Sequence, residues 1–449
     1  MNKEGIIILG ANPISELLIA RLNMQGFKLT VIDIDSPYFT LIQSRYDVQA
    51  ITGHPSHPDI LALAQNDDTA MLIAVTEHDE TNILACQIGH SVLRIPTLIA
   101  SISSPSYHDA DKIFGENQKA ITHLVNHDES IFKDIEHLVR QPRYKLVWPI
   151  SQGFVATTLA INSSHEFYQQ SLAEIIPNLP SKTIIAGLFR HGEWVKFRKN
   201  IKIANKDVLL FITRDHQLPM LTSHLKPVTN ILLLGISSFT YAICRYLQTN
   251  YSITVIEPNI QKCEELSQNY PHIKIINNDP QEQKTLKDYQ IEQSLVIAAS
   301  SDDEDNLIYS FHAHDCQAPH LLTVINRIRQ GHIFEHSPID YTILTPQIIT
   351  DEIIRNILAP KNVQYFYTRT NQLQLADIKI HAEHPFSNQS LQYIKSHYHF
   401  HIGAILREGQ VLFTTKELTV QPGDHLILYS SHSQETPPYL EKVLFQLKL

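Results

Sequence analysis

Short apolar runs alternate with amphipathic segments along the N-terminal part of the chain. Apolar runs of about four to six residues lie at 6–9, 29–32, 71–75 and 97–100. Between the first two, the segment ISELLIARLNMQGF repeats its apolar positions every three or four residues and stops at Gly26, a typical helix end. Strands that alternate with helices at this spacing predict right-handed βαβ units and a parallel sheet covered on both faces.

The same pattern returns later in the chain as an internal repeat. Gly10 in IIILG corresponds to Gly235 in ILLLG, 225 residues later, and Asp33 in LTVID corresponds to Glu257 in ITVIE, 224 residues later. IAVTEHDETN at 73–82 likewise matches IAASSDDEDN at 297–306. The second set of apolar runs lies at 231–234, 253–256, 294–298 and 321–325. We therefore predict a duplicated parallel-sheet domain.

A different, smaller repeat follows each copy. AGLFRHG at 186–192 resembles GAILREG at 403–409, and KDVLLFI at 206–212 resembles GDHLILY at 423–429. Each segment reads as a short helix (171–176 and 390–397) followed by short strands with turns at Gly192 and Gly409. The predicted fold class is α/β, with two tandem Rossmann-like parallel-sheet domains, each followed by a small α+β domain. The predicted limits are 1–125, 146–225, 228–348 and 366–449, with crossover helices and linkers at 126–145 and 349–365.

Two helical segments follow the predicted sheets. DESIFKDIEHLV at 128–139 and DEIIRNIL at 351–358 are each apolar on one side. They either pack in the core of their own half, or cross to the other half and close the pair.

Composition excludes several classes of protein. The 449 residues carry a formal net charge of −10, with 36 Lys and Arg against 46 Asp and Glu, and no dense basic run favours nucleic acid. No apolar run approaches the roughly 18 residues that a membrane helix needs. The chain enters a strand almost at once, so we expect no secretory signal. The four cysteines have no CxxC spacing and are expected to be small buried side chains in a reducing cytoplasm.

The first strand-turn-helix of each copy resembles a dinucleotide-binding turn that has lost two of its three glycines. The three positions hold Gly10, Asn12 and Ser15 in the first copy, and Gly235, Ser237 and Thr240 in the second. Asn12 followed by Pro13 predicts a capped helix start, and Ser237 before Ser238 can cap the second helix in the same way. A capping side chain occupies the place where a phosphate oxygen would accept from the helix amides. The turn therefore predicts either a nucleotide site or a scaffold with filled helix ends.

Acidic and polar residues remain at the predicted strand ends. Asp33 and Glu257 end the second strands, where a carboxylate accepts from both ribose hydroxyls and repels a 2′-phosphate, which favours NAD or an adenosine phosphate over NADP. The polar loops that begin at Thr76 and Ser300 follow later strands at the same edge of the sheet. As an alternative, acids that open a helix simply suit its dipole.

The arrangement resembles the TrkA family, regulatory subunits of bacterial Trk potassium uptake systems that are built from paired RCK nucleotide-binding and RCK C-terminal domains. The stretch 52–87, TGHPSHPDILALAQNDDTAMLIAVTEHDETNILACQ, is similar to the family pattern, as are 295–307, VINR at 324–327 and ILTPQ at 343–347. Family members usually keep all three glycines, and arginines where this chain has Ala100, Ser101 and Ser103; the second copy keeps Asn326 and Arg327. We therefore expect the second copy to hold nucleotide more readily than the first.

The resemblance implies a protein without chemistry of its own. It implies binding of NAD(H) or of ATP and ADP, a membrane-embedded potassium translocator of the Trk type as partner, a homo-oligomer (dimer or tetramer), and a peripheral position on the cytoplasmic face of the inner membrane. The candidate cofactor-binding residues are Gly10, Asn12, Pro13, Asp33, Thr76, Gly235, Ser237, Ser238, Glu257, Ser300 and Arg327.

Other functions have less support from the sequence. HPSHP at 54–58 and HYHFH at 397–401 invite a metal site, and a strand at 397–401 would put His397, His399 and His401 on one face, but these lack Cys or carboxylate partners at ligand spacing. No GxSxG or HExxH supports a hydrolase. An NAD-dependent oxidoreductase requires an intact glycine turn and a convergent acid or base, and the small domains offer none. A Rossmann-like scaffold that has lost nucleotide binding remains an alternative.

Overall fold

The computed structural model describes most of the chain in two compact units. The described residues are 4–104, 107, 120–140, 144–161, 163, 165–190, 193–195, 198, 200–222, 228–289, 291–327, 339–358, 363–368, 373–398, 400–412, 415, 417–431, 440, 443 and 444. Unit 1 contains Met1–Phe132, Ile325–His332 and Leu344–Asn356, and unit 2 contains the remainder. Because the two units are separate bodies, each is described by itself.

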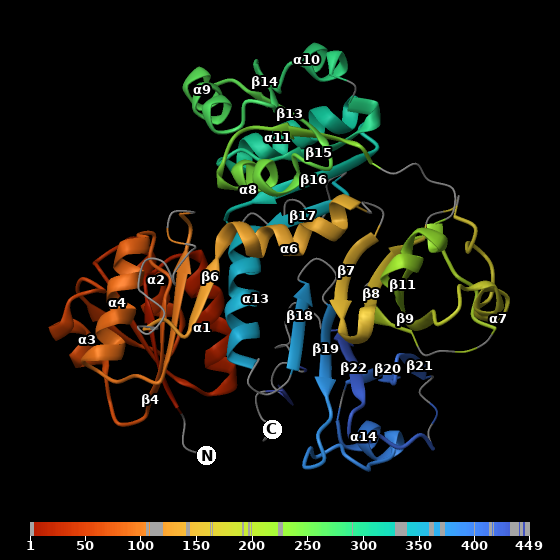
Figure 1. Ribbon diagram of the computed structural model, residues 1–449, viewed down its shortest axis with the longest axis horizontal. Helices are drawn as coiled ribbons and strands as arrows, with labels where there is room; N and C mark the ends of the chain where they lie inside the picture. Colours follow the sequence, from red (N-terminus) through yellow and green to blue (C-terminus); the bar gives the residue numbers. More distant parts are fainter. Residues whose placement is uncertain are drawn as a thin grey trace. The chain divides into compact units, whose positions relative to one another are not determined.

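Unit 1 is built on a six-stranded parallel sheet with helices on both faces (Figure 1). The strand order is β3-β2-β1-β4-β5-β6, which is the order of a Rossmann fold. Its strands are β1 (Gly5–Leu9), β2 (Lys28–Asp33), β3 (Gln49–Thr52), β4 (Thr69–Ala74), β5 (Thr97–Ile102) and β6 (His123–Asn126). Its helices are α1 (Pro13–Gln25), α2 (Pro37–Arg45), α3 (Pro58–Ala64) and α4 (Asp79–Ser91). The predicted Rossmann-like domain is confirmed.

The sequence pattern identified four of these six strands. Strands β3 and β6 were missed because each has four residues and neither is a continuous apolar run: β3 reads QAIT and β6 reads HLVN. They lie at the two edges of the sheet, where fewer neighbours demand apolar side chains. The predicted end of α1 is confirmed, because Gly26 has a φ of 82° and its N–H donates to the carbonyl of Asn23.

Helix α13 (Thr345–Leu358) comes from the second half of the chain, yet its residues up to Asn356 belong to unit 1. Arg21 on α1 donates to the carboxylate of Asp351, and the hydroxyl of Thr350 lies 3.4 Å from the carbonyl oxygen of Ile14. The alternative in which this helix crosses to the other half is therefore the observed one. Helix α6 (His127–Arg140) also divides between units, since its residues from Lys133 onward cluster with unit 2.

A second Rossmann-like sheet has the same topology, in the order β14-β13-β12-β15-β16-β17. Its strands are β12 (Asn230–Leu234), β13 (Ser252–Glu257), β14 (Lys274–Asn277), β15 (Ser294–Ala298), β16 (His320–Ile325) and β17 (Tyr341–Leu344). Its helices are α8 (Ser238–Leu247), α9 (Ile260–Asn269), α10 (Gln283–Asp288) and α11 (Asp303–Asp315). The duplication seen in the sequence is a duplication of fold, and the short edge strands β14 and β17 were missed for the same reason as in the first copy.

The two small domains are five-stranded sheets whose described pairings are antiparallel, and they share one strand order, β7-β8-β11-β9-β10 and β18-β19-β22-β20-β21. The first contains β7 (Tyr144–Ile150), β8 (Phe154–Ala160), α7 (Leu172–Ile175), β9 (Ile184–Arg190), β10 (Glu193–Trp194) and β11 (Val208–Arg214). The second contains β18 (Val363–Thr368), β19 (Leu373–Lys379), α14 (Leu391–His397), β20 (His401–Arg407), β21 (Gln410–Leu412) and β22 (His425–Ser431). The turn predicted at Gly409 joins β20 to β21, whereas the one at Gly192 lies outside the described residues.

A duplicated ion pair explains why AGLFRHG and GAILREG resemble each other. Arg190 donates through Nε and Nη2 to the two carboxylate oxygens of Asp207, at 2.8 Å each. Arg407 does the same to Asp424, at 2.7 and 2.8 Å. Both aspartates are fully buried, and hydrogen bonding to the carboxylate raises the pKa of each arginine. A bidentate ion pair of this kind holds the strand that contains the arginine against the loop that contains the aspartate.

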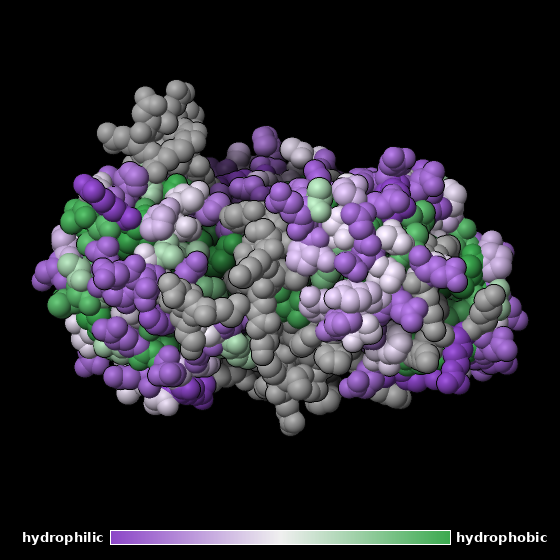
Figure 2. Space-filling view, turned by 90° about the horizontal axis from the view of Figure 1, so that it is seen from below, coloured by the Kyte–Doolittle hydropathy of each residue, from purple (hydrophilic) through white to green (hydrophobic). Residues whose placement is uncertain are grey.

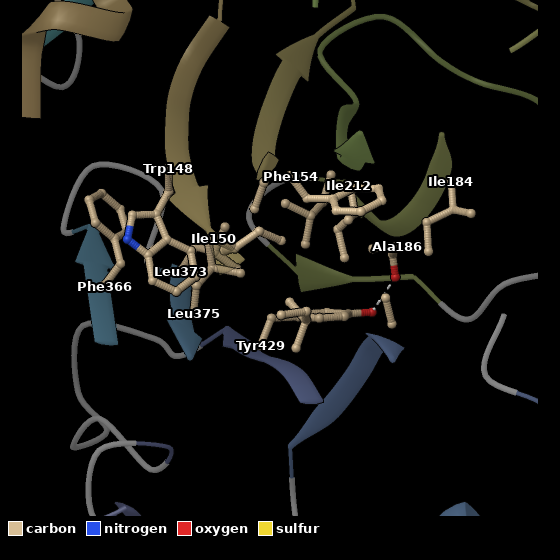
Figure 3. Close-up of a cluster of buried hydrophobic side chains, with 14 of the residues drawn as sticks. Trp148, Ile150, Phe154, Ile184, Ala186, Ile212, Phe366, Leu373, Leu375 and Tyr429 are labelled. Atoms are coloured by element: carbon tan, nitrogen blue, oxygen red, sulfur yellow. Dashed lines mark hydrogen bonds between the residues drawn. The ribbon is translucent and has the colours of Figure 1, made fainter. Parts of the chain in front are cut away.

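The two small sheets share one hydrophobic core (Figure 3). Trp148 and Phe366, from β7 and β18, have ring centroids 5.9 Å apart. Tyr429 on β22 donates its hydroxyl to the carbonyl of Ala186 on β9, at 2.8 Å. A Cβ atom placed on Gly403 would lie only 3.2 Å from the Cβ of Ala186, and each residue occupies the bulge of its own sheet. Equivalent positions of the two copies therefore meet across the interface, as in a symmetric dimer.

The described surface mixes polar and apolar residues. On the face drawn in Figure 2, hydrophilic residues cover most of the described surface and hydrophobic ones form separate patches. None of the helices within the described ranges is both long and apolar enough to cross a bilayer. The four cysteines are buried and free, as predicted.

Candidate functional site

Each Rossmann-like sheet has its topological switch point between the first and fourth strands of that copy. Gly10 follows β1 with a φ of 101°, and a Cβ atom there would lie 2.9 Å from Cα of Thr76. Gly235 follows β12 with a φ of 93°, and a Cβ atom there would lie 2.7 Å from Cα of Ser300. Two constraints thus require glycine at the first position of each turn. One is the positive φ, and the other is the close approach of the loop that contains Thr76 or Ser300. Open α/β sheets bind ligands at this point.

Capping side chains fill the start of the first-copy helix, as predicted. The Asn12 amide oxygen accepts from the N–H groups of Ile14 and Ser15, at 3.0 and 3.1 Å, and its amide nitrogen donates to the carbonyl of Val75. Pro13 occupies the first helical position. The Asn12 side chain therefore ties the turn to the end of β4 while it satisfies two helix amides.

The second-copy helix starts with a smaller cap. The Ser237 hydroxyl donates to the carbonyl of Ala299 at 2.7 Å, and Thr240 accepts from the Ser237 N–H at 3.2 Å to form a capping box. Ser238, at the first helical position, is exposed. Asn12 and Ser237 thus donate to equivalent carbonyls, those of Val75 and Ala299. The capping side chain is smaller in the second copy.

The two acids end the second strands as predicted, but their carboxylates bond backbone amides. Asp33 accepts from the N–H of Ala11 at 2.5 Å and from its neighbour Ile34 at 2.7 Å. Glu257, which is 4% exposed, accepts from Ile236 at 2.7 Å and from Asn259 at 2.9 Å. Each carboxylate therefore stabilises its turn, a role that the sequence did not indicate, and the interpretation of these acids as ribose ligands stays a prediction.

A pair of buried asparagines that sequence reasoning missed connects the loops at each switch point. Asn82 accepts from the N–H of Thr76 and donates to the carbonyls of Thr76 and Ser101, at 2.9 to 3.0 Å. Asn306 does the same for Ser300 and for Val324. Both asparagines are fully buried and lie at the same position of the matching ten-residue stretches, which was the available signal.

Two serines at the end of β5 in the first copy, Ser101 and Ser103, contact a histidine. The Ser101 hydroxyl lies 2.6 Å from Nε2 of His127, and the Ser103 hydroxyl lies 3.2 Å from Nδ1 of the same ring. The equivalent loop in the second copy contains Arg327, which is exposed and lies two residues after the end of β16. The second copy thus has a permanent positive charge, Arg327, at this edge of the sheet. The first copy has instead the uncharged hydroxyl groups of Ser101 and Ser103 next to the imidazole of His127.

Sequence reasoning also missed two charged residues at the turns. In the second copy, Lys262 on α9 reaches back to the glycine turn, where Nζ lies 3.3 Å from the carbonyl oxygen of Ile236. In the first copy the buried carboxylate of Glu16 lies in the first helical turn, where it accepts from Tyr38 at 2.6 Å and pairs with Arg45 at 3.1 Å. Tyr38 and Lys262 each lie five residues after the acid that ends the second strand, so the position is shared.

Several carboxylates lie near the second switch point. Asp302 caps α11 by accepting from Glu304 and Asp305, at 2.8 and 3.4 Å. Burial raises the pKa of Asp305, and the nearby charges of Asp302 and Asp279 raise it further. At the place of Asp279, after the third strand, the first copy has His54, whose ring stacks on His57 with centroids 4.8 Å apart.

The histidines of the stretch 397–401 do not lie on one strand. His397 ends α14 and His401 starts β20, so the expectation of one strand face is wrong, and His399 lies outside the described residues. Within the parts of the chain that the structure describes, no three His, Cys, Asp or Glu side chains form a group able to hold a metal ion.

Comparison with known proteins identifies the family. The family model described as the TrkA-N domain matches residues 6–122 and 231–345, which together make more than half of the 449 residues. The chain belongs to the TrkA-N domain family. The first TrkA-N segment runs from β1 through β5 and ends just before β6, and the second runs from β12 through β17.

Full-length relatives and a solved structure share the whole arrangement. The chain is 25% identical to the Trk system potassium uptake protein TrkA of Vibrio alginolyticus, covering 94% of this chain and 95% of the relative. It is also 25% identical to the protein of the same name from Haemophilus influenzae, covering 98% of each. A structure of the GsuK channel bound to NAD superposes with a TM-score of 0.62 at 15% identity, covering 96% of this chain and 78% of that chain. At this identity the superposition shows a common fold.

Proposed function

We propose that this chain is the non-catalytic regulatory subunit of a Trk-type potassium uptake system, in which a bound adenine nucleotide or NAD(H) biases the state of a membrane-embedded translocator. The observation that carries the proposal is the similarity to proteins named Trk system potassium uptake protein TrkA, which extends over nearly the entire length of both chains. Similarity of this extent includes the small domains as well as the Rossmann-like ones, so the complete four-part arrangement is shared.

The two switch points support a nucleotide as the ligand. Each retains the turn glycine, Gly10 or Gly235, and an acid, Asp33 or Glu257, held next to the turn by hydrogen bonds. A carboxylate at that strand end suits ribose hydroxyls and opposes a 2′-phosphate, which favours NAD(H), ATP or ADP over NADP. Thr76, Ser300 and Arg327 complete the candidate site from the neighbouring loops. A related fold, the GsuK channel, has been solved bound to NAD.

Regulation requires that the ligand bind two conformations of the assembly with different affinity. The exchange of α13 onto α1 provides a physical connection between a helix that follows the second sheet and the helix that opens at the first-copy turn. We therefore propose a homo-oligomer, dimer or tetramer, that acts from the cytoplasmic face of the membrane and carries no catalytic group. The domain limits given from the sequence are part of the same proposal.

A scaffold without a ligand is the second candidate, because the Asn12 side chain occupies two helix amides where a phosphate would bind. Potassium flux distinguishes the two. A Trk-type translocator reconstituted in liposomes should show a flux that depends on NADH or ATP only when this protein is added. A flux that the protein changes equally with and without nucleotide supports the scaffold. A flux that the protein never changes contradicts both.

A further inference from the structure

The first- and second-copy turns, residues 10–15 and 235–240, carry charges of opposite kind around otherwise similar backbones. The fourth residue of the helix is the buried Glu16 in the first copy and Tyr241 in the second. The residue five positions after the strand-ending acid is Tyr38 in the first copy and Lys262 in the second. The first turn therefore has a carboxylate, Glu16, beside it and the second turn has a cation, Lys262, at a different position of the repeat.

The charge next to each turn attracts or repels the pyrophosphate of a nucleotide. Lys262 Nζ lies 3.3 Å from a carbonyl oxygen of the second-copy turn, and Lys262 forms no salt bridge with any residue in the described part of the chain. A half-buried ammonium at the N-terminal end of a helix adds to the favourable field for an anion. In the first copy, Glu16 at that end opposes an anion, and the nearby Arg45 is already paired with Glu16.

The neighbouring positions differ in the same direction. In the first copy Asn12 occupies two helix amides, whereas Ser237 is smaller and bonds Ala299. On the nucleoside side, Asp279 in the second copy provides an acceptor for hydroxyl or amino groups, and His54 in the first copy replaces that acid. Each of these differences favours the second copy.

We infer that each chain binds one adenine nucleotide, at the second-copy turn, with Lys262 as a residue that positions the phosphate, and that the first copy is a structural platform for α13. This inference rests on the proposed function, because it assumes that a nucleotide is the ligand. Lys262 donates to a phosphate oxygen in place of its present contact with the Ile236 carbonyl, and Glu257 orders the turn that holds it.

Calorimetric titration of the ligand-stripped, full-length protein with NADH, and separately with ADP, tests the inference. We expect a stoichiometry of about one per chain. The isosteric change Lys262→Met should weaken binding by at least about tenfold, and Asp33→Asn in the first copy should change the dissociation constant less than about twofold. Lys274→Met is the matched control, because Lys274 lies in the same copy at the start of β14, over the ring of Tyr289, away from the turn.

Each result has one meaning. Two sites per chain, or a single site that Lys262→Met leaves unchanged, overturns the inference. Absence of binding for both ligands in the wild-type protein counts against nucleotide regulation itself, and so concerns the proposed function. Melting curves of the three variants that match the wild type exclude unfolding as the cause of any loss.

Discussion

Arg21 and Asp351 form a buried ion pair across 330 residues of sequence, between α1 and the exchanged helix α13. Their side chains are only 8% and 5% exposed. A buried pair costs desolvation energy to form, but removal of one partner leaves an uncompensated charge in the core. The main effect of the pair is therefore to fix the register in which α13 packs on α1.

Asp351→Ala should lower the free energy of unfolding of unit 1 by about 3–5 kcal/mol, because it removes the carboxylate that pairs with the buried Arg21 guanidinium. Urea denaturation followed by circular dichroism measures the change. Asp68→Ala is the control: Asp68 pairs with Lys28 at 2.6 Å, but both side chains are about half exposed, so its loss should cost less than about 1 kcal/mol. Equal losses for the two variants would show that burial of the Arg21 pair contributes nothing.

Glu257→Ala should destabilise the second Rossmann-like domain as well as weaken nucleotide binding. The carboxylate is buried and accepts from the N–H groups of Ile236 and Asn259, so its removal leaves two donors without an acceptor and costs about 2–4 kcal/mol. Asp33→Ala should cost about 1–2 kcal/mol, because its carboxylate is partly exposed and water can replace it. The thermal midpoints of the two variants measure the ranking, and the reverse ranking would contradict this account of the turns.

Gly403→Ala should loosen the interface between the two small domains. The new methyl group would lie 3.2 Å from the Cβ of Ala186, so the two strands must shift apart by a few tenths of an ångström, and overpacking costs about 1–3 kcal/mol. The double variant Ala186→Gly with Gly403→Ala keeps one methyl group at this contact, so it should recover part of the loss, while the contacts with Tyr429 and Ile212 at 3.3 and 3.4 Å remain. A double-mutant cycle in urea measures the coupling. Additive losses would mean that the two positions do not share the contact.

Stability should fall in mild acid through His384. This ring is buried, its Nδ1 accepts from the N–H of Phe386 at 3.0 Å, and burial lowers its pKa to about 4. An unfolded histidine has a pKa of about 6.5, so between these values the unfolded chain binds the proton and the folded chain does not. The stability contributed by the neutral ring is complete above about pH 6.5 and is lost as the pH falls toward 4, by up to about 3 kcal/mol.

His384→Asn tests this pH dependence, because an asparagine oxygen can replace the Nδ1 acceptor and does not titrate. The plot of unfolding free energy against pH should become flatter between pH 6.5 and 4 than in the wild type. His397→Asn, at an exposed histidine at the end of α14, is the control and should keep the wild-type slope. An unchanged slope in His384→Asn would show that this ring is not the group that takes up the proton.

The sequence by itself determined the features that depend on a few neighbouring residues. A glycine after an apolar run predicted the tight turns at Gly10 and Gly235, and Asn12 followed by Pro13 predicted a capped helix start. The repeat in the sequence predicted two copies of each domain, because equal patterns of apolar positions bury equal faces. It also identified Asp33 and Glu257 as strand-ending acids, since strand ends are read from local periodicity.

Only the tertiary structure decided what each of these residues contacts. The approach of Lys262 to Ile236, the contact of Glu257 with the Ile236 amide and the ion pair of Arg21 with Asp351 join segments that lie 21 to 330 residues apart in the chain. Local backbone preferences act over a few residues and do not specify which distant residue a side chain will contact. Packing of whole helices and strands sets these distances, so the charge at each turn, and with it the difference between the two copies, emerges only in the folded protein.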